Sequence, residues 1–168
     1  VNILTGADAV VGDMISASPI PQMLTLIGST QTGMHVMRTG STTIKRYSME
    51  LGGDAPVLVF EDADLELAAD TICALKFGNS GQICVAPNRV YAHKSIAQFL
   101  AEQIVDRARS TRVGYDRQAP IAMGPVIDGG AWKRIDGMVR ETVAAGAQLL
   151  TGGGRPAGID RGSFYAPT

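Results

Sequence analysis

The fold is decided by the stretch Met23-Leu24-Thr25-Leu26-Ile27-Gly28-Ser29-Thr30-Gln31-Thr32-Gly33. Its first five residues are apolar except for one threonine, which predicts a buried strand. The glycine-bounded turn that follows leads into a predicted helix over about residues 30–40. A short strand over 2–4 and a helix over 7–15 are predicted before it, so strand, helix, strand and helix alternate. That alternation is typical of a parallel α/β sheet.

The same α/β pattern continues to the end of the chain, with a change of composition that places a domain boundary near residues 51–54. We therefore predict two parts, residues 1–52 and residues 53–168. The remaining predicted elements are strands over 45–51, 56–60, 89–93 and 148–151, helices over 64–77, 95–109 and about 132–143, and the beginning of a strand at 164. Asp64 is predicted to cap its helix, and Ser95 with Gln98 forms a predicted capping box.

Composition excludes several classes of protein. An apolar content of 45% with 18% charged residues predicts a globular chain, and 168 residues are enough for a sizeable core. With a net charge of −1, the chain has no excess of positive charge that would favour binding to nucleic acid or to an anionic membrane surface. No apolar run approaches the roughly 18 residues of a membrane-spanning helix, and the start of the chain lacks a charged signal-peptide region. We therefore predict neither a nucleic-acid partner nor a membrane partner.

The two cysteines indicate thiol chemistry rather than a metal site. Cys73 and Cys84 form no C-x-x-C motif, and the only histidines are His35 and His93, so no metal is predicted. Unpaired thiols favour a reducing, cytoplasmic compartment. Neither end of the chain looks like the end of a complete protein, and we interpret it as a segment of a longer one.

The glycine turn from Gly28 to Gly33 lies where a strand passes into a helix, and backbone N–H groups there can receive a phosphate. Met34-His35 stand where a nucleotide triphosphatase loop would carry Lys and Ser/Thr, which argues against that class. The dinucleotide pattern G-x-G-x-x-G is absent as well. Taken alone, the turn could equally be a tight connection that binds nothing.

Cys84 and Glu50 are the candidate chemical groups. Cys84 lies in a loop between Asn79 and Pro87, where a thiol is accessible and backbone N–H groups can meet an oxyanion. The alternative for Cys84 is a buried structural thiol, a role that Cys73 within its predicted helix fits better. Glu50 has apolar neighbours and two glycines behind it, which predicts partial burial and a stronger base. A surface carboxylate is the alternative.

Three motifs in this order resemble those of the NAD(P)-dependent aldehyde dehydrogenases: Gly28-Ser29-Thr30-x-x-Gly33, Glu50-Leu51-Gly52-Gly53 and Gly81-Gln82-x-Cys84. The resemblance covers the whole chain and extends to Gly124-Pro125, Gly152-Gly153-Gly154 and Phe164-x-x-Pro167-Thr168. It implies an aldehyde dehydrogenase-like α/β fold. Residues 1–52 would be the C-terminal part of a Rossmann-type cofactor domain, and residues 53–168 the first part of the catalytic, thiol-bearing domain.

The resemblance also implies roles. The Cys84 thiolate would add to a small-molecule aldehyde to give a thiohemiacetal, with hydride passing to NAD or NADP. Glu50 would activate the water that hydrolyses the resulting thioester. Cofactor contacts are implied for Thr5, Gly6, Gly28, Ser29, Gly33, Leu51 and Gly52. Substrate-lining positions are implied for Gln82, Ile83 and Val85, the last two as the residues that shape the site.

Residues 81–89 look most like the succinate-semialdehyde and lactaldehyde branches of the family. Two alternatives stay open: a CoA-acylating relative, in which a thiol releases the acyl group and the glutamate is not needed, and a catalytically inactive fragment. The resemblance implies that the parent protein is a homo-dimer or homo-tetramer. It also implies that other cofactor and interface segments lie outside these residues, so we expect the 168-residue chain to be inactive alone.

Overall fold

The computed structural model describes residues 1–6, 9–116 and 122–168. The chain divides into two compact units, Val1–Gly53 and Asp54–Thr168.

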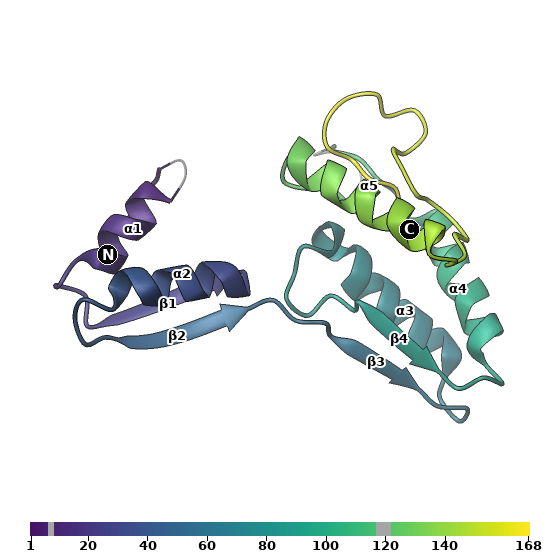
Figure 1. Cartoon of the computed structure of the whole chain (residues 1–168). Helices are drawn as coiled ribbons and strands as arrows, with labels where there is room; N and C mark the ends of the chain where they lie inside the picture. Colours follow the sequence, from purple (N-terminus) through teal and green to yellow (C-terminus); the bar gives the residue numbers. More distant parts are fainter. Residues whose placement is uncertain (7–8, 117–121) are drawn as a thin grey trace. The chain divides into compact units, whose positions relative to one another are not determined.

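The first unit is a two-stranded parallel sheet with helices (Figure 1). Its elements are α1 (Val10–Ala17), β1 (Met23–Gly28), α2 (Thr30–Gly40) and β2 (Arg46–Leu51). The strands β1 and β2 pair in register from Met23↔Arg46 to Gly28↔Leu51, and α2 is the crossover between them. The parallel α/β character predicted from the sequence is confirmed, and α2 has the predicted bounds.

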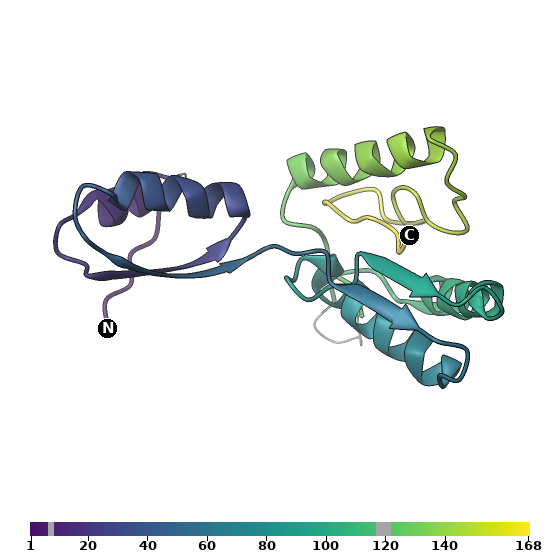
Figure 2. The ribbon, with the colours of Figure 1, turned by 60° about the horizontal axis from the view of Figure 1, so that its bottom comes forward.

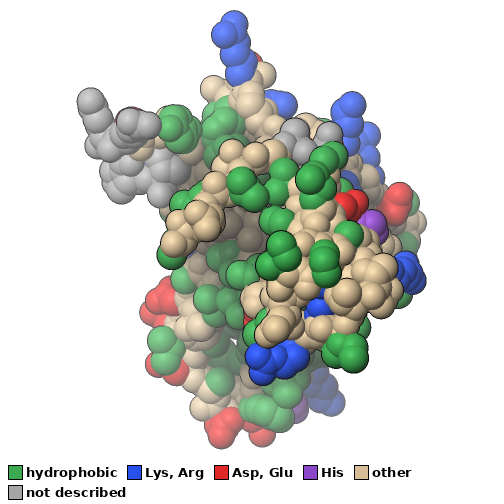
Figure 3. Space-filling view, turned by 90° about the vertical axis from the view of Figure 1, so that its left-hand side faces the viewer, with side chains coloured by type: hydrophobic (Ala, Val, Ile, Leu, Met, Phe, Trp, Pro, Cys, Tyr) green, Lys and Arg blue, Asp and Glu red, His purple; other side chains and the backbone are tan. Residues whose placement is uncertain are grey.

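Small residues allow α2 to lie close against one face of this sheet. A Cβ atom on Gly33 would lie 3.1 Å from the Leu51 side chain, and one on Gly40 would lie 2.5 Å from the Tyr47 hydroxyl. The opposite face carries Met23 and Ile27, which are 49% and 81% exposed. Figure 3 shows hydrophobic side chains, in green, at the molecular surface on one side of the protein. The prediction that residues 23–27 form a buried strand is therefore wrong, because the described helices of this unit cover one face of the sheet.

The second unit contains another parallel pair of strands and three longer helices (Figures 1 and 2). Its elements are β3 (Pro56–Val59), α3 (Leu65–Phe77), the 3₁₀ turn η1 (Gly78–Gly81), β4 (Arg89–Ala92), α4 (Ala97–Ser110) and α5 (Gly129–Ala144). The strands β3 and β4 pair from Pro56↔Arg89 to Val59↔Ala92. One core cluster joins Val59, Ala69, Ile72 and Leu100, and a second joins Cys73, Phe77, Ala108 and Met123.

Helix capping follows the prediction at α3 but not at α4. The Asp64 carboxylate accepts a hydrogen bond from the Leu67 N–H at 3.1 Å. The Ser95 hydroxyl instead lies 2.7 Å from His93 Nδ1, and α4 begins at Ala97 without a side-chain cap. The predicted capping box is thus wrong, because a neighbouring imidazole takes the hydroxyl.

Three short predicted strands are not formed. Residues 2–4 are exposed and irregular, and neither 148–151 nor the stretch from 164 onward is a strand. Within the described residues each sheet has two strands, and none of these three segments pairs with them. A strand needs a hydrogen-bonded neighbour, which an apolar run in the sequence does not guarantee.

The C-terminal segment runs alongside α5 (Figure 2) and is held there by Trp132. The Trp132 indole N–H donates to the Phe164 carbonyl at 2.8 Å, and its ring lies 5.4 Å from the Tyr165 ring. The buried Tyr165 hydroxyl donates to Asp136 Oδ1 at 3.3 Å. Burial, together with the neighbouring Asp136 carboxylate, raises the pKa of Tyr165 to about 12.

The raised pKa of Tyr165 predicts that the folded chain loses stability in strong base. Because the folded pKa lies above the ordinary value of about 10, the stabilisation is fully present below pH 10 and is lost as the pH rises through 12. We expect the free energy of unfolding to fall by about 1–2 kcal/mol over this range. Urea unfolding followed by Trp132 fluorescence at several pH values measures it.

The matched variants separate this phenol from the other titrating groups. Tyr165→Phe should remove most of the loss between pH 10 and 12, whereas Tyr115→Phe, at a 75% exposed position, should keep it. The same pH dependence in Tyr165→Phe as in the native chain would show that another group is responsible.

Candidate active site

The turn that precedes Cys84 has an unusual backbone. Asn79, Ser80 and Gly81 have positive φ angles of 48°, 58° and 73°. Two of these residues are not glycine, and each costs about 1 kcal/mol in this conformation. The turn ends α3 and reverses the chain, so that residues 82–86 form a separate loop before β4.

Cys84 lies at the outside of this loop. A hydrogen bond from the Ala86 N–H to the Ile83 carbonyl, 3.0 Å, closes a tight turn around it. The Cys84 side chain is exposed, and so are Ile83 and Val85, at 41% and 55%. Ala86 and the following proline are buried and anchor the loop to the unit. The loop therefore presents a thiol between two aliphatic side chains.

Cys73 is the opposite case. It is 8% exposed in the core of the second unit, and its thiol donates to the Ile104 carbonyl at 3.9 Å. Burial raises the pKa of the Cys73 thiol, with a smaller contribution from Asp70 that is opposed by Arg107. Cys73 therefore packs in the core, in keeping with the structural role predicted for it.

The contrast predicts selective alkylation. We expect iodoacetamide at neutral pH to modify Cys84 at least about tenfold faster than Cys73, because access and thiolate formation both limit the buried thiol. Peptide mass analysis of the time course measures the two rates. In urea the two rates should become similar, and equal, slow labelling of the folded chain would contradict the expectation.

Glu50 lies near the end of β2, in register with Ile27 of β1. Its side chain is exposed, so the predicted partial burial is wrong. The strand pleat explains the difference: Leu51 packs toward α2, and the preceding residue consequently points to the uncovered face. Gly52 and Gly53 follow it and are exposed. Glu50 belongs to the first unit and Cys84 to the second.

The glycine turn forms the start of α2. The Ser29 hydroxyl accepts from the Thr32 N–H at 3.1 Å and lies 2.8 Å from the Thr32 hydroxyl, so it caps the helix. Gly28 ends β1, and Gly33 is buried against Leu51. No acidic residue lies in the first turn of α2. An exposed helix N-terminus without a carboxylate fits the phosphates of a dinucleotide.

Thr5 and Gly6, the first two implied cofactor residues, lie in an irregular segment. Both are exposed and lie outside the helices and strands.

Among the described residues, no group of three or more His, Cys, Asp or Glu side chains could hold a metal ion. The described helices also include none with the length and apolarity needed to cross a membrane.

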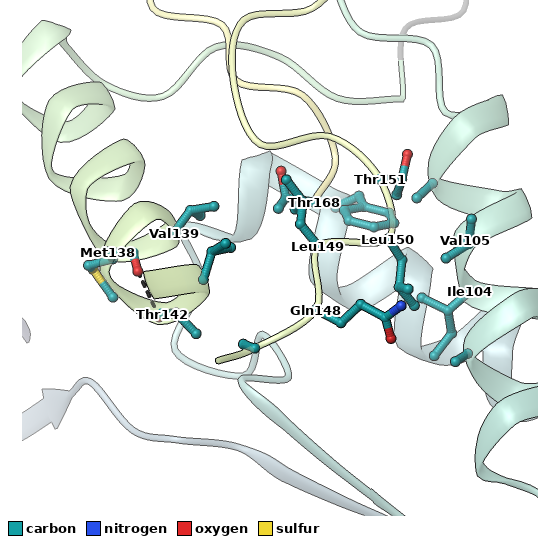
Figure 4. Close-up of a pocket in the computed structure, with 15 residues that line it drawn as sticks. Ile104, Val105, Met138, Val139, Thr142, Gln148, Leu149, Leu150, Thr151 and Thr168 are labelled. Carbon is teal, nitrogen blue, oxygen red and sulfur yellow. Dashed lines mark hydrogen bonds between the residues drawn. The ribbon is translucent and has the colours of Figure 1, made fainter. Parts of the chain in front are cut away.

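The second unit contains several hollows, two of which differ clearly in their lining. The first, of about 460 Å³, lies between Ile104 and Val105 of α4, Met138 and Val139 of α5, and residues 147–151 (Figure 4). No charged residue or cysteine is among the described residues that line it, so it does not offer the chemistry of Cys84. The second, of about 570 Å³, lies beneath the cysteine turn, and Lys76 and Gln82 are among its lining residues.

The whole sequence of the chain, and its fold over nearly the whole chain, match known proteins. The aldehyde dehydrogenase family model matches residues 1–168. Succinate-semialdehyde dehydrogenase [NADP(+)] 2 of Schizosaccharomyces pombe is 34% identical over 99% of this chain and 34% of its own length. The 3-sulfolactaldehyde dehydrogenase of Pseudomonas putida is 36% identical over 99% of this chain and 34% of its own length.

Solved structures agree with these relatives. The succinate-semialdehyde dehydrogenase of Burkholderia pseudomallei matches with a TM-score of 0.91 and 34% identity, over 98% of this chain and 34% of that one. The lactaldehyde dehydrogenase of Escherichia coli matches with a TM-score of 0.86 and 33% identity, over 94% of this chain and 32% of that one.

The structure is an α/β chain with an exposed cysteine in a loop. The chain belongs to the aldehyde dehydrogenase family, as the match over residues 1–168 shows. The predicted likeness to the succinate-semialdehyde and lactaldehyde branches is confirmed. The chain spans about a third of the length of the curated relatives that it matches.

Proposed function

We propose that this chain is the part of an aldehyde dehydrogenase that supplies the nucleophile and the base for oxidising an aldehyde to a carboxylic acid. The observation that carries the proposal is the contrast between two cysteines in a chain of this family. One is buried in the core, and Cys84 is presented to solvent in a tight turn.

The residues have complementary tasks. The Cys84 thiolate adds to the aldehyde carbon to give a thiohemiacetal, and the backbone N–H at Cys84 is a donor for the oxygen that becomes negative. The carbon then loses a hydride and becomes a thioester. Glu50 takes a proton from water, which attacks the thioester, frees the acid and returns the thiol. One aldehyde, one oxidised cofactor and one water give one acid, one reduced cofactor and one proton.

The hydride acceptor is NAD or NADP, whose nicotinamide supplies the redox chemistry when it is bound. The S. pombe relative is named for NADP(+), and a similar betaine aldehyde dehydrogenase structure from Staphylococcus aureus holds NAD+. Here the first unit, with the α2 N-terminus at Gly28 and Ser29, would hold the pyrophosphate, with Thr5, Gly6 and Gly33 around it. Leu51 and Gly52 would lie toward the nicotinamide. The second unit would be the first part of the thiol domain.

A small or semialdehyde substrate fits the proposal best, since relatives are named for succinate semialdehyde and sulfolactaldehyde. Ile83 and Val85 flank the thiol and would shape the substrate site. We propose a cytoplasmic protein that assembles as a homo-dimer or homo-tetramer, in keeping with two cysteines that form no disulfide.

The test is an aldehyde panel on a protein of the relatives' length that carries this chain. Succinate semialdehyde with NAD+ or NADP+ should give the free acid at a rate that CoA does not change. A requirement for CoA would establish the acylating alternative, and turnover of no aldehyde would establish a non-catalytic member.

We further propose that the 168-residue chain alone does not complete the reaction, because the relatives use about three times this length. Turnover of an aldehyde by the purified chain of 17.6 kDa would refute this.

A further inference from the structure

The loop that carries Cys84 is tied to a distant segment of the same unit. The Ser80 hydroxyl donates to the Gly124 carbonyl at 2.6 Å. The Gln82 side-chain carbonyl accepts from the Ile127 N–H at 2.9 Å. These contacts join positions 44 and 45 residues apart in the sequence.

The other end of the Gln82 amide is engaged as well. Its NH₂ group donates to the Asn79 carbonyl at 2.9 Å and approaches the Pro125 carbonyl at 3.5 Å. The Asn79 side chain in turn donates to the Gln82 main-chain carbonyl at 3.2 Å. The Gln82 side-chain carbonyl thus binds the 124–127 segment, while its NH₂ group binds the strained turn at Asn79.

We propose that Gln82 is a positioning residue for Cys84, whose amide braces the cysteine turn against residues 124–127 instead of contacting the substrate. The proposal rests on the nucleophilic role proposed for Cys84. It changes the role that the family resemblance implies for Gln82 and leaves Ile83 and Val85 as the residues that shape the substrate site.

Two effects favour movement of the cysteine loop away from the position in which the Gln82 amide holds it. The positive φ angles of Asn79 and Ser80 favour relaxation of the turn. The exposed Ile83 and Val85 favour folding of the loop onto the unit, because burial of aliphatic surface is favourable. Either movement would withdraw the thiol from solvent. An amide suits the task because it both donates and accepts, whereas a carboxylate only accepts and a thioether does neither usefully.

The test compares Gln82→Met, Gln82→Glu and the control Gln98→Met in the 168-residue chain. Gln98 is exposed on α4, and its side chain bonds only within that helix, to Glu102, in the contacts described. Two rates are measured: hydrogen exchange at the Ile127 amide and iodoacetamide alkylation of Cys84. Cys73 alkylation and Trp132 fluorescence report whether the unit remains folded.

We expect Gln82→Met to speed Ile127 exchange by about tenfold, the loss of one ordinary hydrogen bond. It should slow Cys84 alkylation by at least about threefold, because the unbraced loop withdraws the thiol. Gln98→Met should change neither rate. In Gln82→Glu, the second oxygen of the ionised carboxylate would face the Asn79 and Pro125 carbonyls and be repelled by them, which should displace the side chain and lower the protection of the Ile127 amide at pH 8. The protection, corrected for intrinsic exchange, should rise as the pH falls to 4, since a protonated carboxyl donates and accepts like the amide.

Several outcomes would overturn the proposal. Unchanged Ile127 exchange in Gln82→Met would show that the bond does not hold the segment. Faster exchange with equal or faster Cys84 alkylation would make Gln82 structural only. If Gln82→Met fails to fold, the pH comparison within Gln82→Glu decides, and unrecovered protection overturns the proposal. Failure of the proposed function has a separate signature: Cys84 of the native chain labelled no faster than Cys73.

Discussion

Replacing Cys84 with serine is expected to lower the rate of aldehyde oxidation by at least about a thousandfold in a full-length protein that carries this chain. Serine has nearly the same size, and position 84 is exposed in a turn, so the fold should be unaffected. The hydroxyl is a far weaker nucleophile than a thiolate at neutral pH. Formation of NADH or NADPH with succinate semialdehyde measures the loss.

The matched control is Cys73→Ser. This buried cysteine has its thiol on the Ile104 carbonyl, and replacing it should cost stability while the folded fraction keeps its rate per molecule. Retained oxidation in Cys84→Ser, or an equal loss per folded molecule in Cys73→Ser, would contradict the assignment of the nucleophile.

Replacing Glu50 with glutamine is expected to slow steady-state turnover by about a hundredfold to ten-thousandfold, the usual range for a general base. The first turnover should survive, because hydride transfer precedes the step that needs the base. Rapid mixing should therefore show a burst of reduced cofactor close to one per active site, followed by a slow phase. Stability should change by less than about 0.5 kcal/mol, since the side chain is exposed.

Glu61→Gln is the matched control, because Glu61 is an exposed glutamate of the other unit, with an exposed fraction of 68% for its side chain. It should leave both phases unchanged. If Glu50→Gln removed the burst as well, Glu50 would act before hydride transfer; if it left turnover unchanged, water would be activated by another group.

Local signals predicted the elements that depend on local contacts. The glycine turn predicted the start of α2, where Ser29 bonds to Thr32 only three residues away. Asp64 predicted the start of α3 in the same way. The predicted strands at 2–4 and 148–151 failed because a strand depends on a partner elsewhere in the chain. The Ser95 capping box failed because His93 competes for the hydroxyl.

In the candidate site, too, the sequence predicted what nearby residues determine and missed what distant contacts determine. The glycine and proline residues around Cys84 predicted an accessible loop, which the exposed thiol confirms. The position of Cys73 within a predicted helix was compatible with packing or with the helix surface, and the structure shows packing. The burial of Glu50 depends on what covers its face of the sheet, which its neighbours in the sequence do not report. The contact between Gln82 and Ile127 spans 45 residues, and no sequence period predicts it. The catalytic and cofactor roles themselves remain proposals.

Mass analysis of the trapped acyl-enzyme shows directly which residue carries the acyl group. The Glu50→Gln form of the full-length protein is mixed with succinate semialdehyde and NAD+ or NADP+, quenched in acid and digested. We expect a succinyl thioester on the peptide that contains Cys84, absent without cofactor and released by hydroxylamine. An acyl group on Cys73 or on another residue, or no acyl group while reduced cofactor is formed, would contradict the assignment of Cys84 as the nucleophile.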